Sequence, residues 1–255
     1  LRPDALDEDN ALERQFTVLP HLNLILVQNI TDLRGFDNPR TWLELAMHNQ
    51  AEKGAGAKAK FNNVQEAYAA ASQEAIRKME SGAADPTAIP FSVSLEGKIP
   101  EQINPDLLRD AHLVIALDVD QLLPEAMDAF RGYVMRGGTI LLAPGASVKA
   151  ERFNAAFGPL SPAPMAPPAT GSIDPRRYEQ CLVEAGDAAF LRELEDPRHG
   201  NLGAARFYRW FKVDPESLAD ESRVLLALSD GDPLLLERTL GRGRVLLWTA
   251  GLGGD

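Results

Sequence analysis

The chain has 255 residues, with 26 Lys and Arg against 37 Asp and Glu, and its formal net charge is −11. This acidic balance argues against nucleic acid or anionic lipid as a partner, because both require a basic surface. The single Cys181 excludes an intrachain disulfide and a Cys-rich zinc site. No apolar run is long enough to span a bilayer, and hydrophobic residues at 45% are typical of a globular protein.

The first part of the chain alternates between polar segments and short apolar runs. Residues 1–20 are acidic and polar, and the run LNLILVQ predicts the first buried strand, which ends at Asn29. The expected elements in chain order are a linker over 1–20, a strand over 22–28, helices over 39–49 and 64–79, a strand over 91–95 and a short helix over 107–110.

Residues 111–157 carry the clearest pattern, and they predict strand, helix, strand and helix. The apolar runs at 112–119 and 139–143 are typical of strands that are buried on both faces. Between them, Leu123, Met127 and Phe130 stand at helical spacing, and Gly137 is expected to stop the helix. This is a βαβ unit, so its two strands must be parallel.

The character of the chain changes after Phe157. A Pro-rich loop is expected over 159–175, because proline cannot continue a helix or join a central strand. Further along, the expected elements are helices over 178–182 and 188–194, an aromatic strand over 205–213, and strands over 224–228, 234–239 and 244–249. The turn sequence LGRGR joins the last two strands and predicts an antiparallel hairpin.

Together these elements favour an α/β fold, with a mostly parallel sheet flanked by helices and a C-terminal antiparallel hairpin. One domain over 21–255 is favoured over two, because a parallel sheet is often finished by antiparallel strands. Both ends of the chain look cut, so we expect a piece of a longer protein.

Five residues stand where such folds place their ligands, at the carboxyl ends of strands: Asn29, Asp118, Asp120, Gly145 and Ser147. The two aspartates, with Asp128, could hold Mg²⁺, but capping of the following helix by Asp120 is favoured. Helix capping is likewise the favoured role of Ser147. We therefore expect no metal and no cofactor, and the five residues are candidates for ligand binding only.

Nucleophilic catalysis is not expected from this chain. Cys181 lies in YEQCLVEAG, which predicts a helix, whereas a nucleophile elbow needs a turn from strand to helix. The four histidines show no ligand or acid–base spacing. The aromatic residues around Trp210 could line a partner surface, although such residues more often bury themselves.

Several blocks together resemble one known family. DEDN, LNLILVQN, AHLVIALDVDQLLPEAMDAFRGYVMRGGTILLAPG and DGDPLLLERTLGRGRVLLWT occur in the order seen in bacterial BatA-like, aerotolerance-regulator-type membrane proteins. The resemblance implies a flavodoxin-like, class I glutamine amidotransferase-like domain between transmembrane helices. The chain departs from true amidotransferases because it has no Cys at an elbow and no following His-x-Glu pair.

The resemblance and the missing triad together predict a non-catalytic domain of a membrane-anchored envelope protein. It would act in protein interaction or ligand sensing, with protein partners, a possible small-molecule ligand and no nucleic acid. The resemblance implies tethering by helices outside residues 1–255 and a periplasmic location, with a cytoplasmic one still open. The alternative is a hydrolase or carbohydrate-processing enzyme that uses carboxylates or a metal at the strand ends.

Overall fold

The computed structural model describes residues 21–29, 43, 92–167, 178–182, 191 and 202–251. The chain divides into two units, residues 1–22 with 54–92 and residues 23–53 with 93–255, and the account below concerns the second. Outside the described residues lie the expected linker over 1–20 and the helix over 64–79, together with the helices over 39–49 and 188–194 apart from Leu43 and Leu191. The prediction of a single domain over 21–255 stays a prediction.

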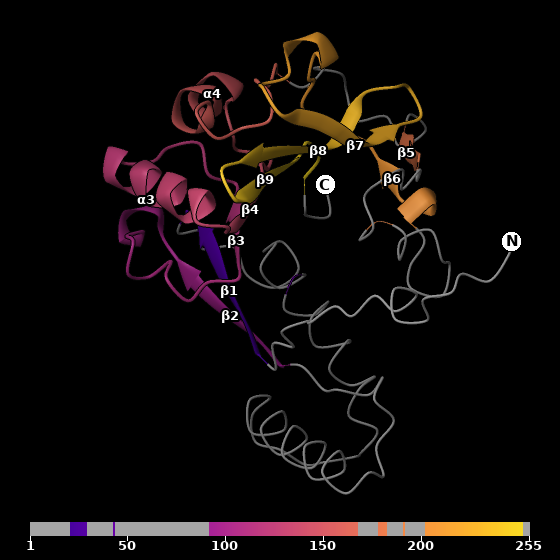
Figure 1. Cartoon of the computed structure of the whole chain (residues 1–255). Coiled ribbons are helices and arrows are strands. Elements are labelled where there is room, and N and C mark those ends of the chain that lie inside the picture. Colours follow the sequence, from indigo (N-terminus) through magenta and orange to yellow (C-terminus); the bar gives the residue numbers. More distant parts are fainter. Residues whose placement is uncertain are drawn as a thin grey trace, which may run out of the picture. The chain divides into compact units, whose positions relative to one another are not determined.

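The described residues form a nine-stranded sheet with the order β2-β1-β3-β4-β9-β8-β7-β5-β6 (Figure 1). In chain order the strands are β1 (His21–Gln28), β2 (Ser92–Lys98), β3 (Leu113–Leu117), β4 (Thr139–Ala143), β5 (Glu179–Leu182), β6 (Arg206–Phe207), β7 (Ser222–Leu228), β8 (Pro233–Leu240) and β9 (Gly243–Trp248).

The predicted βαβ unit is confirmed. Strands β3 and β4 pair in parallel, with Val114 opposite Ile140, and the helix α3 (Pro124–Met135) connects them. Proline at the first helical position suits the start of α3, because its missing N–H would have no partner there. Gly137 follows the helix with φ +115°, a conformation that glycine adopts without steric cost.

The expected mostly parallel, flavodoxin-like sheet flanked by helices is wrong. Strands β1, β3, β4 and β9 are parallel neighbours, but β9-β8, β8-β7, β7-β5 and β5-β6 are all antiparallel. Apart from the helical Leu43, the α-helices in the described part of the chain are α3 and α4 (Ala150–Phe157). The physical reason lies in the connections: β7, β8 and β9 are joined by turns of a few residues, too short for the crossover that parallel strands require.

The C-terminal hairpin itself has the predicted form, with β8 and β9 antiparallel from Leu235 opposite Trp248 to Leu240 opposite Gly243. The expected helix over 178–182 is wrong, because this segment is strand β5 and Cys181 pairs with Leu228.

The expected helix over 107–110 is also wrong. The segment forms turns, in which the Asn104 side chain accepts hydrogen bonds from the backbone of Asp106 and Leu107. A 3-10 helix, η3, lies earlier, at Pro100–Gln102.

The main core lies between the sheet and the two helices, which pack on the same face of it (Figure 1). Phe130 of α3 and Phe153 and Phe157 of α4 are almost completely buried there. Each such side chain contributes roughly 1.5–3 kcal/mol of transfer free energy to folding. This packing holds both helices in one core with the sheet, and α3 contacts β4 and β9. No helix in the described segments has both the length and the apolar character needed to cross a membrane.

Candidate functional site

Asp118 directly follows β3 and has a strained backbone. Its φ is +54°, in the left-handed region that residues with a Cβ avoid at a cost of roughly 1–2 kcal/mol. The backbone N–H of Asp118 donates a hydrogen bond of 3.0 Å to the carbonyl of Ala143 at the end of β4. Strain of this kind persists only where the surroundings enforce it, and it is concentrated at functional sites.

The side chain of Asp118 is held by its neighbours. Its Oδ2 accepts a hydrogen bond of 2.6 Å from the Ser147 hydroxyl, whereas its buried Oδ1 has no hydrogen-bond partner among the described residues. The amide of Asn29, at the end of β1, donates to the Asp118 carbonyl at 3.2 Å. Three residues predicted separately from the sequence therefore meet at one point.

Gly145 completes this group because its missing side chain makes room for Asp118. A Cβ on Gly145 would lie 2.7 Å from Oδ1 and 2.8 Å from Cγ of Asp118, inside the closest approach of real Cβ atoms. Only glycine therefore fits beside the carboxylate. We call Asn29, Asp118, Gly145 and Ser147 the Asp118 cluster.

Asp120, the fifth predicted residue, does not join the Asp118 cluster. Its side chain is 8% exposed, and its Oδ2 accepts a hydrogen bond of 3.2 Å from the backbone N–H of Lys149. Lys149 is the N-cap residue of α4, so Asp120 supports the start of α4 and not, as expected, the helix that follows it in the chain. The structure thus gives Asp120 a structural role.

In the described part of the chain, Ser147 is hydrogen-bonded to Asp118 and to no histidine. A serine is activated by a group whose pKa lies near the working pH, most often histidine, and a carboxylate is a poor substitute. The described histidines stand at the amino-terminal side of parallel strands, His21 at the start of β1 and His112 just before β3. There the Nδ1 of His112 accepts a hydrogen bond of 3.0 Å from the backbone of Asn23.

Cys181 is a poor nucleophile in this fold. It is 4% exposed in β5, and burial raises the pKa of its thiol to about 11. At neutral pH it is therefore protonated, and the thiolate that would react is scarce. Within the described ranges, Asp118, Asp120 and Asp128 do not belong to any group of three His, Cys, Asp or Glu side chains that is arranged suitably for a metal.

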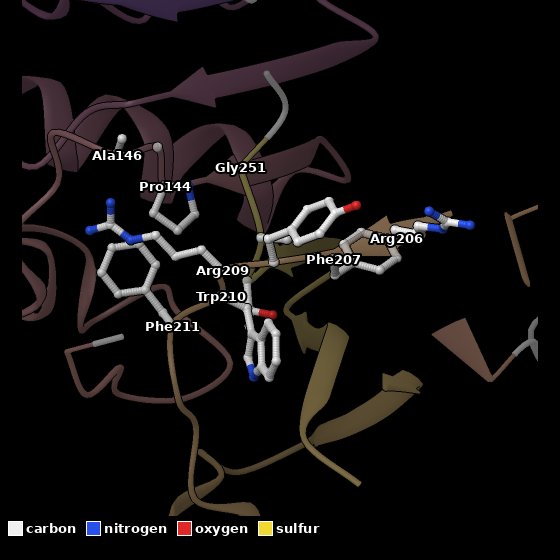
Figure 2. Close-up of a pocket in the computed structure, with 12 residues that line it drawn as sticks. Pro144, Ala146, Arg206, Phe207, Arg209, Trp210, Phe211 and Gly251 are labelled. Atoms are coloured by element: carbon white, nitrogen blue, oxygen red, sulfur yellow. The ribbon is translucent and has the colours of Figure 1, made fainter. Parts of the chain in front are cut away.

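A pocket of about 170 Å³ opens beside the Asp118 cluster (Figure 2). It lies between the loop after β4, the segment 206–211 and the chain that follows β9. The lining residues are Pro144, Gly145, Ala146, Arg206, Phe207, Tyr208, Arg209, Trp210, Phe211, Thr249, Ala250 and Gly251. Gly145 belongs both to this lining and to the Asp118 cluster.

Sequence reasoning missed the two arginines of the pocket. In the segment ARFYRWF, the alternation of Phe207, Arg209 and Phe211 predicts a half-buried strand, and this pattern assigns the two arginines no binding role. Backbone pairing brings this segment to the strand ends. The N–H of Phe211 donates a hydrogen bond of 3.0 Å to the carbonyl of Thr249, and Trp210 forms an isolated bridge with Ala250. Alternation of cations with aromatic residues was the available signal.

Phe207, Tyr208, Trp210 and Phe211 form the aromatic wall of the pocket. A side chain outside the pocket lining holds Trp210 in place. The indole Nε1 of Trp210 donates a hydrogen bond of 2.6 Å to Asp232, which is also paired with Lys212. Burial alone would raise the pKa of Asp232, but the hydrogen bonds from Lys212 and Trp210 outweigh it and hold the pKa below its ordinary value. Lys212 also lies 5.0 Å from the centre of the Trp210 ring. The orientation of Trp210 is thereby fixed.

Comparison with known proteins identifies a fold but no family. No family model matches the chain, and no curated protein matches it. Two cytoplasmic proteins of Salmonella typhimurium are similar in structure at 13% sequence identity. STM1381 of strain LT2 has a TM-score of 0.52, with 92% of this chain and 90% of that chain covered. STM3548 has a TM-score of 0.54, with 92% and 89% covered. At this identity the likeness shows a shared fold and nothing about function.

Part of a larger enzyme also aligns with the chain. A β-galactosidase from Bacillus circulans sp. alkalophilus is 12% identical, with a TM-score of 0.46, and the alignment covers 90% of this chain and 28% of that one. This likeness is too low to carry an argument.

Proposed function

We propose that this domain binds a ligand without turning it over, and that the ligand occupies the pocket beside the Asp118 cluster. The observation that carries the proposal is how the residues at the strand ends are bonded and packed. Asp118 is held by the Ser147 hydroxyl and confined by Gly145, and neither described histidine belongs to a strand end on that side. The strand-end position therefore holds a hydroxyl–carboxylate pair with no described histidine beside it.

The pocket supports the binding part of the proposal. It combines half-buried aromatic rings with two exposed arginines, and its walls belong to segments fixed by backbone pairing. Binding sites in proteins are concave and mostly apolar, with a few polar groups that set the orientation of the ligand. Such a site needs no nucleophile, and ligand sensing or partner recognition would use the same surface.

A hydrolase or carbohydrate-processing enzyme is the second candidate, and one observation favours it. The 2.6 Å hydrogen bond between Ser147 and Asp118 joins a hydroxyl to a carboxylate at a strand end, next to an open pocket. In such an enzyme Ser147 would be the nucleophile and Asp118 its partner. The two candidates therefore differ in whether these two side chains carry turnover.

Turnover assays of the full chain distinguish the candidates. The substrates would be p-nitrophenyl acetate, p-nitrophenyl β-galactoside and glutamine, with Ser147→Ala and Asp118→Asn as matched variants. The proposal expects rates equal to the uncatalysed background for all three proteins. Hydrolysis by the native chain that both variants abolish would establish the second candidate and overturn the first.

We also propose, from the sequence resemblance alone, that the domain belongs to a membrane-anchored envelope protein. The full gene product would then partition with the membrane fraction after high-salt washing. Recovery of the full gene product entirely in the aqueous fraction would contradict this.

A further inference from the structure

The charge of the pocket lining is opposite to that of the whole chain. The chain carries 37 acidic against 26 basic residues, yet the twelve residues of the lining include Arg206 and Arg209 and no Asp or Glu. Anions are repelled by the chain as a whole, so a local excess of positive charge marks the place where an anion can be held.

Arg209 is the arginine that is available to a ligand. It is exposed and has neither a hydrogen bond nor an ion pair within the described segments. In Figure 2 its side chain points to the side of the pocket formed by Pro144 and Ala146, whereas Arg206 points the opposite way. The Arg206 guanidinium lies 4.6 Å from the centre of the Tyr178 ring, so it already has a partner.

The loop after β4 offers further donors in the pocket lining. The backbone N–H groups of Gly145 and Ala146 donate no hydrogen bond to any described residue, although the next turn closes from Val148 to the Gly145 carbonyl at 3.2 Å. Backbone amides and a guanidinium are the donors that carboxylate and phosphate groups take in proteins.

The aromatic side chains of the lining are held in place by their neighbours. Phe207 packs edge-on against Trp248 at 5.9 Å between ring centres, and Tyr208 packs edge-on against Tyr178 at 6.1 Å. With Trp210 fixed by Asp232, these rings lose little freedom when a flat group packs on them.

We propose that this pocket binds a small ligand that carries a carboxylate or phosphate on a flat apolar group. Arg209 and the amides of Gly145 and Ala146 hold the oxyanion, and the aromatic wall holds the ring. This assignment rests on the proposed function and names the class of ligand. Asp118 is outside the lining, but its Oδ1 has no hydrogen-bond partner among the described residues and lies close to Gly145, so the attraction of Arg209 for the oxyanion must exceed the repulsion from this carboxylate. At about 170 Å³ the pocket suits a ligand smaller than a drug-sized molecule.

Isothermal titration calorimetry of the full chain tests the proposal with three probes of matched shape. Benzoate carries the carboxylate, phenyl phosphate carries the phosphate, and benzamide is the neutral counterpart. We expect saturable binding of at least one anion, at least tenfold weaker binding of benzamide, and weakening by added salt. The anion that binds more tightly shows whether the pocket prefers a carboxylate or a phosphate.

Two arginine variants locate the contact. Arg209→Gln should weaken anion binding about 10- to 100-fold, as expected for the loss of a charge-assisted hydrogen bond. Arg152→Gln removes the same charge from the exposed side of α4, outside the pocket lining, so it is the matched control, with an expected effect of less than about threefold. Arg209 and Arg152 are both exposed, so both variants should keep the melting temperature of the native chain.

Three results would overturn the assignment: no saturable binding of either anion, equal binding of benzamide, or equal losses in the two variants. Equal binding of benzamide would leave the proposed binding function intact and remove only its anionic character. Release of phenol from phenyl phosphate would instead contradict the non-catalytic function, while the class of ligand would stand.

Discussion

Replacing Gly145 by alanine tests the geometry of the Asp118 cluster. The new Cβ would lie 2.7 Å from Oδ1, 2.8 Å from Cγ and 3.1 Å from Cβ of Asp118, so the carboxylate must move. It cannot move freely, because its Oδ2 is hydrogen-bonded to Ser147 and its backbone N–H to Ala143. Overpacking of this kind costs typically 1–3 kcal/mol.

We expect a loss of about 2 kcal/mol in the free energy of unfolding of Gly145→Ala, the middle of that range. For a chain of this size, each kcal/mol lowers the melting temperature by about 2–4 °C, so the expected shift is about 4–8 °C. Urea unfolding followed by far-UV circular dichroism measures the loss, and an unchanged slope of free energy against urea shows that the fold is retained.

A second substitution shows whether Asp118 is the cause. Asp118→Gly removes the side chain that the new Cβ meets and suits the φ of +54°. In that background Gly145→Ala should cost less than about 0.5 kcal/mol, so the coupling energy between the two positions is at least about 1.5 kcal/mol. Equal costs in the two backgrounds would refute the reasoning.

Three further predictions concern other parts of the fold. Gly243→Ala should cost more than Gly145→Ala, over about 3 kcal/mol, because its Cβ would lie 2.2 Å from the backbone oxygen of Gly138, which cannot rotate away; a smaller loss in urea unfolding would contradict this. The pKa of Cys181 rises from 9.0 to about 11 on folding, so its contribution to stability is full below pH 9 and is lost as the pH rises from 9 to 11. The stability of Cys181→Ala relative to the native chain should therefore improve across that window, and a constant difference would argue against burial as the cause. The pKa of Asp232 lies below its ordinary 3.8, so the stabilisation by its pairing with Lys212 is present above that pH and lost as the pH falls through the lowered value. Asp232→Asn should be less stable than the native chain at pH 7 and lose that difference in acid, and a difference that persists below pH 2 would count against the pairing.

The elements that were predicted correctly are those with a strong local signal. The apolar runs of β3 and β4 and the helical spacing in α3 lie next to one another in the chain, and a βαβ connection allows one arrangement only. The segment 178–182 failed for the opposite reason. Its residues are compatible with a helix or a strand, and the pairing of Cys181 with Leu228 decides for a strand.

The fold class was wrong because pairing at the sheet edge is a long-range property. The parallel neighbours β1, β3, β4 and β9 follow the expected pattern, but β8, β7, β5 and β6 extend the sheet by antiparallel pairing. Nothing in the local composition of β5 and β6 indicates which strand they join.

The candidate site was predictable only where its residues follow from local sequence patterns, and not where they depend on long-range pairing. Asn29, Asp118 and Ser147 were found because carboxyl ends of parallel strands meet at one edge of a sheet. Arg209 was not found, because its place beside Gly145 depends on backbone pairing of the segment 206–211 with residues that follow β9.

The central claim is that the pocket beside the Asp118 cluster holds an oxyanion without turning it over. The most direct test is a titration of the ¹⁵N-labelled chain with phenyl phosphate, followed by two-dimensional NMR. The account predicts saturating shifts of the amides of Gly145, Ala146 and Arg209, with the phenyl phosphate spectrum unchanged after prolonged incubation. Shifts confined to residues outside the pocket lining, or the appearance of free phenol, would contradict it.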